Sequence, residues 1–403
     1  MASNNKHTGP NVPALRFPEF SGEWESCTLG DITNNFSRRN KDRIQYPMFS
    51  VTNNRGFVPQ SEQFEDREMV GEDIQAYKVI EKGDFAYNPA RINVGSIAKY
   101  EGNGKCMISS LYVCFNTIDR IDRDWFMHLL KTPKMNFYYN LNGEGGVRVY
   151  LFYPNFARIR SSYPSLAEQK KIAAMLSLID ERIATQSKII EELKTLRGAL
   201  NESLYCCCES YQELSFNDVG VSYSGLSGKS GNDFGYGYPF IPYTNIFTNN
   251  IIDEGQLEYV QVREDESQNS VCFGDLLMTL SSETPEEVGI GAVYLGHESP
   301  LYLNSFAFGI HITRTDLVYP PYLSWLVSTK SFRKFILPYA QGSTRYNLQK
   351  TDFMKAKYRF PTLGQQKAIS VLLSGYSSKI ENEERVLNKY TALKQGLIEQ
   401  LFI

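Results

Sequence analysis

Loops rich in Asn, Thr, Ser and Arg are the parts of this sequence whose residue types could do chemistry. In the first half of the chain they hold Thr52, Asn53, Asn54 and Arg55, and then Asn88, Arg91 and Asn93. Arginine can bind guanine O6 and N7 together, asparagine can bind adenine N6 and N7, and glutamate can accept from cytosine N4. The competing explanation for any single position is turn formation, because Asn, Ser and Gly are common in turns.

Similar loops occur in the second half of the chain, and one arginine position is repeated in both halves. Two arginines stand out because each follows a glycine-rich turn: Arg148 comes after Gly145-Gly146, and Arg345 after Gly342-Ser343-Thr344. Glycine lets a backbone approach a ligand closely, so at this repeated position a ligand contact is favoured over a turn role. The positions expected to contact DNA are Arg38, Arg39, Lys41, Thr52, Asn53, Asn54, Arg55, Asn88, Arg91, Asn93, Arg148, Thr244, Asn245, Ser281, Ser282, Glu283, Thr344, Arg345 and Asn347.

Catalytic motifs are not evident. The motifs of an amino-methyltransferase are missing, and the nearest stretch is Asn88-Pro89-Ala90. Gly228-Lys229-Ser230 imitates the end of a phosphate-binding loop, but Tyr223 stands where its first glycine must be. The four histidines are scattered and the seven cysteines form no CxxC pair, so reduced thiols and no metal site are expected. The sequence therefore favours recognition over catalysis.

Charge and composition limit the kind of surface that can be present. The 403 residues carry a formal net charge of −3. Residues 206–360 hold 17 Asp and Glu against 11 Lys and Arg, so an anion-binding surface there must be local. No apolar run approaches 18 residues and the first ten residues lack an apolar centre, so neither a membrane span nor a signal peptide is expected.

One stretch occurs twice, and it must position everything else. Residues 164–205 and 361–402 align without a gap at a constant offset of 197, with 12 of 42 positions identical. Each copy opens with a proline and a capping box, Ser165 with Glu168 and Thr362 with Gln365. Each copy is therefore expected to be one long helix.

Apolar residues in each copy follow steps of three and four, which makes a single seam as in a coiled coil. Polar residues interrupt both seams at matching places, Gln186 and Glu383, then Arg197 and Lys394. Two such helices can bury their seams against each other. The residues expected to pack are Ile172, Leu176, Ile179, Ile183, Ile190, Leu193, Leu200, Leu204, Ile369, Leu373, Tyr376, Ile380, Leu387, Tyr390, Leu397 and Leu401.

The segments between the helices repeat more weakly. YPMFSVTNN at 46–54 resembles YPFIPYTNI at 238–246, and Gly83-Asp84-Phe85 resembles Gly274-Asp275-Leu276. Short runs such as 46–51 and 292–295 indicate strands, while 124–131 and 321–336 indicate helices. We expect an α+β fold with an internal pseudo-repeat. Two mixed domains, 1–163 and 206–360, alternate with antiparallel coiled-coil helices at 164–205 and 361–403.

The paired Pro-[Ser/Thr]-Leu-x-[Glu/Gln]-Gln-Lys helix starts and the two-unit order resemble the specificity subunit of type I restriction-modification systems. The opening Leu15-Arg16-Phe17-Pro18-Glu19-Phe20 and Leu29-Gly30-Asp31-Ile32 are also similar to that family. The resemblance implies two target recognition domains, each reading one half of a bipartite, asymmetric site in double-stranded DNA. It implies that the long helices are a spacer and a docking platform for two modification subunits.

The same resemblance implies a division of labour in a cytoplasmic bacterial or archaeal complex. The modification subunits would carry S-adenosylmethionine, and restriction subunits would supply ATP- and Mg-dependent translocation and cleavage, with no cofactor in this chain. The alternative is a non-catalytic scaffold that spaces two ligand- or protein-binding modules. A standalone methyltransferase is disfavoured because the cofactor motifs are missing.

Overall fold

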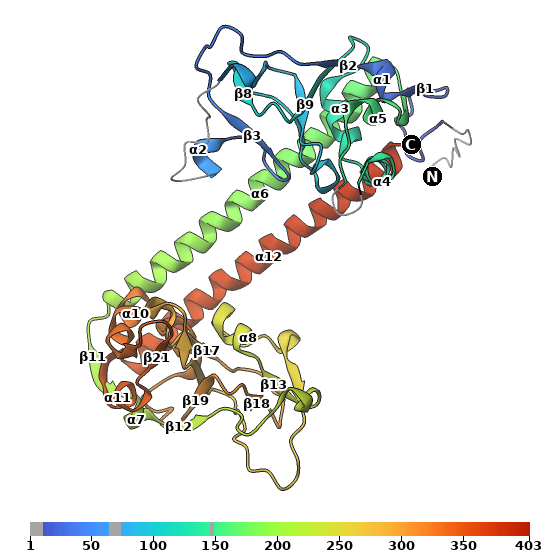
Figure 1. Ribbon diagram of the computed structural model, residues 1–403. Helices are drawn as coiled ribbons and strands as arrows, with labels where there is room; N and C mark the ends of the chain where they lie inside the picture. The colour runs from blue at the N-terminus through green and yellow to red at the C-terminus, as the bar shows by residue number, and fades with distance from the viewer. Residues whose placement is uncertain (1–10, 64–73, 146–148) are drawn as a thin grey trace. The chain divides into compact units, whose positions relative to one another are not determined.

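The computed structural model describes residues 11–63, 74–145 and 149–403. Its contacts divide the chain into unit 1, residues 1–186 and 386–403, and unit 2, residues 187–385. Both boundaries fall inside the two long helices, α6 (Leu166–Cys206) and α12 (Leu363–Leu401), which Figure 1 shows in green and red. Each unit therefore contains half of each helix together with its own globular part, a division that differs from cuts at the helix ends.

Unit 1 is built on a four-stranded antiparallel sheet of order β2-β9-β6-β7. Its strands are β1 (Glu25–Thr28), β2 (Thr33–Phe36), β3 (Phe49–Thr52), β4 (Gly56–Pro59), β5 (Lys78–Ile80), β6 (Phe85–Tyr87), β7 (Ile97–Lys99), β8 (Cys106–Ile108), β9 (Val113–Thr117) and β10 (Arg160–Tyr163). Its shorter helices are α1 (Leu29–Ile32), α2 (Gln60–Gln63), α3 (Arg123–Leu130), α4 (Pro133–Asn142) and α5 (Tyr153–Ala157). Antiparallel pairs β1–β10, β3–β4 and β5–β8 complete the unit.

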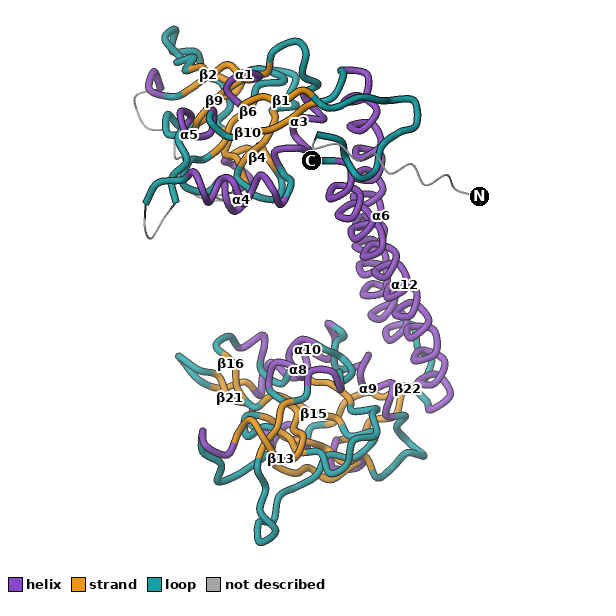
Figure 2. Tube along the Cα trace, turned by 90° about the vertical axis from the view of Figure 1, so that its right-hand side faces the viewer, coloured by secondary structure: helices purple, strands orange, loops and turns teal. Residues whose placement is uncertain are grey.

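Unit 2 repeats this plan with a sheet of order β12-β19-β15-β17 and a closing pair β11–β22 (Figure 2). Its strands are β11 (Tyr211–Ser215), β12 (Gly220–Ser224), β13 (Phe234–Ile241), β14 (Glu258–Val260), β15 (Leu276–Thr279), β16 (Ser281–Ser282), β17 (Gly291–Val293), β18 (Tyr302–Leu303), β19 (Ala307–Ile312), β20 (Ala340–Gln341), β21 (Tyr346–Leu348) and β22 (Lys357–Pro361). Its shorter helices are α7 (Phe216–Val219), α8 (Tyr243–Thr248), α9 (Pro320–Leu326), α10 (Lys330–Ile336) and α11 (Lys350–Lys355). Two further sheets, β14-β13-β18 and β16-β21-β20, flank the central one. The expected α+β fold class is confirmed.

The long helices end in the cores of the two units. Ile172 and Leu176 of α6 are buried in the aromatic core of unit 1, and Ile369 and Leu373 of α12 are buried in that of unit 2. All sixteen residues expected to form the seam are buried or half-buried. Burial of these apolar side chains is the main term that fixes each helix to its unit.

A buried glutamine joins the start of each long helix to the loop before the neighbouring short helix. Gln169 accepts a hydrogen bond from Asp122 N (2.7 Å) and donates to Arg120 O (3.1 Å) and Pro164 O (2.8 Å). Gln366 makes the same three bonds, with Tyr319 N (2.8 Å), Leu317 O (3.0 Å) and Pro361 O (2.8 Å). All four residues are displaced by the same 197 positions. The repeat therefore extends to individual hydrogen bonds, including bonds to residues outside the long helices.

The two helix starts differ in one charge. In the second copy Thr362 N donates to Gln365 Oε1 at 3.1 Å, which is the bond of the capping box made by the Gln365 side chain. In the first copy Glu168 N is 3.4 Å from Ser165 Oγ, but the Glu168 carboxylate instead receives two 2.8 Å bonds from the Arg16 guanidinium. Both side chains of this ion pair are almost completely buried. The first copy therefore lacks the bond that the Glu168 side chain would make to the Ser165 backbone, because an arginine far away in the sequence binds this carboxylate.

The polar positions that interrupt the seam also correspond. In unit 1 Lys394 Nζ lies 2.5 Å from Asp180 Oδ1, and in unit 2 Arg197 Nη1 donates to Ser377 Oγ at 2.8 Å. Each pair joins α6 to α12, and both pairs are related by the offset of 197. These contacts set an antiparallel register of the two helices within each unit.

Candidate nucleic-acid interface

A polar hollow of about 520 Å³ lies beside the β3–β4 hairpin of unit 1, and we call it the unit 1 hollow. Six of the residues expected to contact DNA line it, namely Thr52, Asn53, Asn54, Arg55, Asn88 and Arg91. The sequence reasoning missed Gln60, Glu62 and Tyr112, which also line it. Two loops that are separate in the sequence therefore face one space.

The hairpin turn explains part of this composition. Thr52 Oγ1 accepts from Arg55 N and donates to Gly56 O, both at 3.1 Å, so Thr52 forms the turn. Arg55 makes a 2.8 Å ion pair with Glu62, and both side chains are exposed. Exposed ion pairs contribute little stability, so Arg55 is free to change partner.

The second loop presents one unpaired cation. Asn88 Oδ1 accepts from Ala90 N at 3.0 Å, which closes the turn that precedes Arg91. The Arg91 side chain is exposed and makes no ion pair among the described residues. Asn93 donates to Asn140 at 3.0 Å and lines a neighbouring hollow together with Asn53. Arg91 is thus available to an acceptor from outside.

The other basic residues expected in unit 1 have different surroundings. Arg38 donates to Asp84 Oδ2 at 3.0 Å and lies over the Phe36 ring, so it serves as the counter-ion of a buried carboxylate. Arg39 and Lys41 are exposed and do not line the unit 1 hollow. Arg148 lies outside the described residues.

Unit 2 has a larger hollow, of about 730 Å³, which we call the unit 2 hollow. Ser281, Ser282, Glu283, Thr344 and Arg345 line it, as expected for residues that act together. Its remaining lining residues, which the sequence reasoning missed, are Tyr243, Phe247, Phe306 and Glu287. Tyr243 and Phe247 stack at 5.8 Å, and their spacing of four on one helix is the signal that could have revealed them.

The β16–β21 pairing holds the polar residues of this hollow. Ser281 faces Asn347 in the register, and the exposed Asn347 lies next to the hollow rather than in it. Arg345 Nε donates to Ser281 Oγ at 3.2 Å. A Cβ on Gly342, which has φ 153°, would lie 2.1 Å from the Arg345 carbonyl oxygen, so only glycine permits this turn.

The Thr244-Asn245 pair does not act as one site. Asn245 is fully buried, donates to Asp253 O at 2.9 Å and accepts from Asp253 N at 3.1 Å. These bonds close the loop after α8 and leave the amide no free surface. Thr244 is exposed on α8 but does not line the unit 2 hollow.

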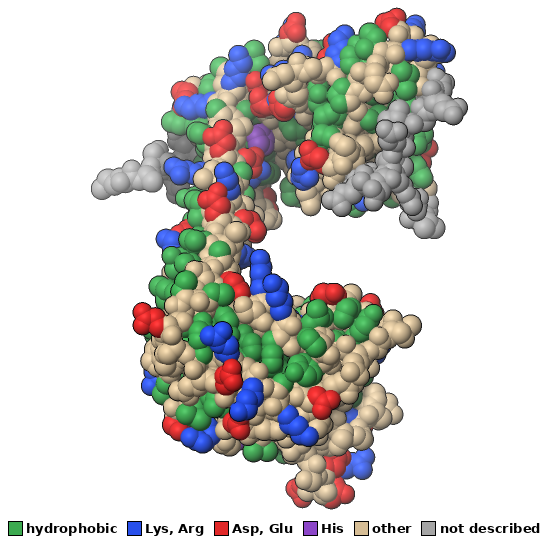
Figure 3. Space-filling model, turned by 90° about the vertical axis from the view of Figure 1, so that its left-hand side faces the viewer, with side chains coloured by type: hydrophobic (Ala, Val, Ile, Leu, Met, Phe, Trp, Pro, Cys, Tyr) green, Lys and Arg blue, Asp and Glu red, His purple; other side chains and the backbone are tan. Residues whose placement is uncertain are grey.

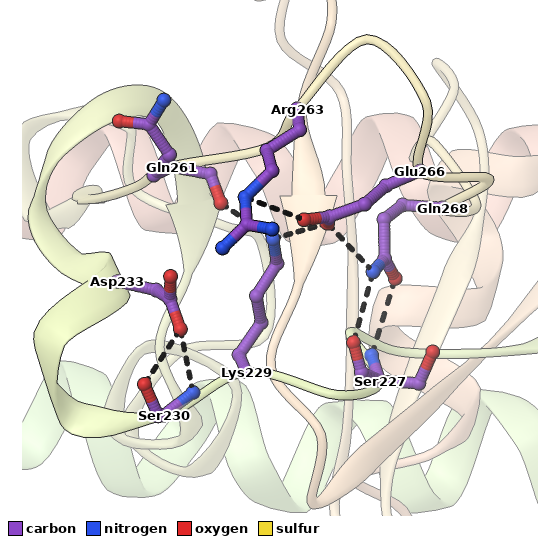
Figure 4. A network of polar contacts seen from close by, with 8 residues as sticks. All are labelled: Ser227, Lys229, Ser230, Asp233, Gln261, Arg263, Glu266 and Gln268. Atoms are coloured by element: carbon purple, nitrogen blue, oxygen red, sulfur yellow. Dashed lines mark hydrogen bonds and ion pairs between the residues drawn. The ribbon is translucent and has the colours of Figure 1, made fainter.

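The stretch that imitates a phosphate-binding loop has a structural role (Figure 4). The Lys229 ammonium is almost fully buried, donates to Gln261 O at 2.6 Å and pairs with Glu266. The bond from Lys229 holds the pKa of Glu266 below its usual value. Ser230 bonds the Asp233 carboxylate through N and Oγ, both at 2.8 Å, so neither residue is free for a phosphate.

One group of side chains in the described part of the chain has metal-ligand types, namely Cys272, Asp275 and His311. The buried Asp275 already accepts from Tyr223 OH (2.6 Å) and Cys272 N (2.9 Å) and bonds His311 Nδ1 (2.7 Å). Asp84 occupies the equivalent turn in unit 1 with Arg38 as its partner. Asp275 is therefore satisfied as a turn-forming carboxylate.

Charge is not gathered into one band on the face that Figure 3 shows. Figure 3 shows Lys and Arg side chains scattered among Asp and Glu on the face in view. No helix among the described residues is long and apolar enough to cross a membrane.

Comparison with known proteins shows which proteins this chain resembles. Residues 21–195 match the family model of the type I restriction modification DNA specificity domain. The putative type I restriction enzyme MjaX specificity subunit of Methanocaldococcus jannaschii is 25% identical over 208 residues, which is 48% of this chain and 48% of the relative. The chain thus spans about half the length of that curated relative. The resemblance noted from the sequence is confirmed.

Solved structures extend the likeness of fold to nearly the whole chain. The type I restriction-modification S subunit from M. genitalium has a TM-score of 0.55 at 14% identity, covering 97% of this chain and 99% of that one. A structure describing complex assembly and conformational transition of the type I R-M system has a TM-score of 0.61 at 13% identity, with coverages of 95% and 98%. At these identities the comparison establishes the fold.

Proposed function

We propose that this chain is the sequence-specific DNA-recognition subunit of a type I restriction-modification complex in the cytoplasm of a bacterium or archaeon. Unit 1 reads one half of a bipartite site and unit 2 reads the other, through their respective hollows. The observation that carries the proposal is that each unit brings separate loops with base-reading residue types to one hollow. The family match of residues 21–195 supports it.

The proposed division of labour leaves chemistry to partners. Two modification subunits supply S-adenosylmethionine and methyl transfer, and restriction subunits supply ATP- and Mg-dependent cleavage. This chain contributes base contacts and a platform, and the α6–α12 pair docks the modification subunits. The net acidic composition of residues 206–360 supports weak DNA binding by the chain alone.

The decisive experiment compares the purified chain with the chain reconstituted with its modification subunits. The chain alone should not methylate DNA, whereas the complex should methylate one bipartite site, read by methylation sequencing of the host genome. Binding by the complex should weaken steeply with salt, because phosphate contacts release counterions. A scaffold for protein modules would show no such salt-dependent binding of duplex DNA, and methyl transfer by the chain alone would contradict the division of labour.

The proposal also gives the long helices a measuring role. Lys394–Asp180 and Arg197–Ser377 mark the antiparallel register, so four residues can be added at the midpoint of both α6 and α12 without breaking either contact. Four residues add about 6 Å of rise and rotate the seam by only about 40° beyond a whole turn. The unread spacer of the site should lengthen by one or two base pairs, at about 3.4 Å each. A two-residue insertion turns the seam by about 200° and should inactivate the complex. An active four-residue variant with an unchanged spacer would show that the helices only dock partners.

A further inference from the structure

Phe306 is a large aromatic side chain held in an exposed position. It is 55% exposed and lines the unit 2 hollow. Its backbone is fixed on both sides, because Phe306 N donates to Asn304 Oδ1 at 2.9 Å and Phe306 O accepts from Leu280 N at 2.8 Å. A single exposed apolar side chain is common on protein surfaces, so the position of this ring in the hollow, and not its exposure alone, points to a binding role.

The same turn occurs in unit 1. Leu111 N donates to Ser109 Oγ at 3.3 Å, and the Leu111 side chain is 79% exposed. The two turns match in sequence as Ser109-Ser110-Leu111 and Asn304-Ser305-Phe306. Both units therefore use a side-chain-capped turn to present one apolar residue to solvent, and only in unit 2 is this residue aromatic.

The ring of Phe306 lies against the arginine of the hollow. The Arg345 guanidinium carbon is 5.5 Å from the ring centroid, and Arg345 Nε donates to Ser281 Oγ. Together these contacts hold the guanidinium beside the Phe306 ring. Neither terminal nitrogen of Arg345 has a hydrogen-bond partner among the described residues, so both remain available to a ligand.

The charges around Arg345 oppose a phosphate ligand. Arg345 is the only Lys or Arg that lines the unit 2 hollow, whereas Glu283 and Glu287 both line it. Glu287 is held there by Ser282 Oγ at 2.9 Å. A phosphate would meet one positive and two negative groups, while a guanine edge offers two acceptors and no charge. Cytosine N4 is in turn a donor that a carboxylate can accept.

We propose that Phe306 is a specificity-determining residue that, with Ser281, positions Arg345 to read a guanine in the half-site of unit 2. The inference rests on the proposed function and specifies one base, a guanine, in the half-site that unit 2 reads. Phe306 acts through Arg345, so its removal changes base preference and leaves the fold intact.

The test uses the reconstituted complex and its methylated site, once the site is read from the genome. Duplexes carry 7-deazaguanine, which lacks the N7 acceptor, at one guanine of the unit 2 half-site at a time. The wild-type complex should lose roughly 10- to 100-fold in affinity at one such position. The complexes with Arg345→Ala and Phe306→Ala should be insensitive to the substitution there, whereas Phe306→Tyr should keep the sensitivity.

The matched control is Phe273→Ala, because Phe273 is an equally exposed phenylalanine of unit 2 that does not line the hollow. It should behave as the wild type, and all variants should melt at the wild-type temperature. Phe306→Leu places the residue of unit 1 in unit 2, keeps apolar bulk without a π face, and should also lose the sensitivity. The inference is overturned if Phe306→Ala retains it, if the half-site holds no guanine, or if Phe306→Ala weakens all sequences equally and lowers the salt slope. A complex with no sequence-specific site would instead contradict the proposed function.

Discussion

The two units share the buried hydrogen bonds that hold their helices in place, but different kinds of residues line their hollows. Gln169 and Gln366 make the same three hydrogen bonds, and Thr132 and Thr329 begin α4 and α10 with the same pair of bonds. The unit 1 hollow, by contrast, is rich in amides, whereas the unit 2 hollow is aromatic and carboxylate-rich. Buried hydrogen bonds are costly to lose, so they keep the frame, while exposed loops can change what they bind.

The largest expected difference between the units comes from the buried ion pair of Arg16 and Glu168, because Gln365 at the start of α12 carries no charge in the place of Glu168. Arg16→Ala leaves the buried Glu168 carboxylate without its partner and should lower the free energy of unfolding of unit 1 by about 3–5 kcal/mol. The control Lys171→Ala removes an exposed pair with Glu19 and should hardly change stability. Chemical denaturation of the full chain checks both. Equal effects of the two variants would mean that the buried pair does not distinguish unit 1.

Loss of the buried glutamine contacts that both units share should destabilise each unit by the same amount. Gln169→Ala and Gln366→Ala each leave two carbonyl oxygens and one N–H without their partner, which should cost about 3 kcal/mol. Hydrogen exchange should show the loss in unit 1 for the first variant and in unit 2 for the second. A large effect in only one unit would break the equivalence of the two frames.

One titrating histidine, His128, should make the stability of the two units depend differently on pH. Burial, with Lys394 nearby, lowers the pKa of His128 to about 4. Unfolded chains bind this proton near the ordinary value of 6.5, so unit 1 should be fully stabilised above pH 6.5 and lose about 3 kcal/mol as the pH falls to 4. Trp325 stands at the equivalent position of unit 2, beneath Arg197 at 5.7 Å. His128→Gln should remove this part of the pH dependence in denaturation curves, and an unchanged curve would exclude His128 as its source.

The smallest effect expected concerns the two arginines of the unit 1 hollow. Arg91 makes no ion pair within the part of the chain that the structure describes, so Arg91→Ala should weaken DNA binding by the complex by about 1 kcal/mol and affect only the unit 1 half-site. Arg55 already pairs with Glu62, so Arg55→Ala should have a smaller effect. Binding titrations with sites altered in one half at a time compare them. The reverse order would show that Arg55 changes partner on DNA.

Local sequence patterns were sufficient to predict the two long helices, which form most of the framework that the units share. The three-and-four spacing and the capping residues located both long helices, which begin at Leu166 and Leu363. The offset of 197 also paired Arg197 with Lys394 before any contact was known. These features are visible in sequence because helix periodicity and caps depend on neighbours within a few positions.

The lining of the hollows was less accessible, because it depends on contacts between distant segments. Asn245 and Arg38 have residue types suited to DNA, yet Asn245 holds a loop and Arg38 pairs with Asp84. Phe306 and Tyr243 reach the unit 2 hollow from separate elements, and no local pattern connects them to Arg345. The type of a loop residue therefore predicts which groups it can bind, but it does not predict whether the side chain is free to bind a ligand.

The division of the chain has a consequence for synthesis. Unit 2 is one unbroken run, 187–385, but unit 1 combines residues 1–186 with 386–403. The Phe402 ring stacks on Trp125 at 5.9 Å, and Leu401 is buried in the same core. Domains usually mature in the order in which they leave the ribosome. Here the half that emerges first cannot close its apolar core until the last turns of α12 are made, so unit 1 is expected to complete its folding after unit 2.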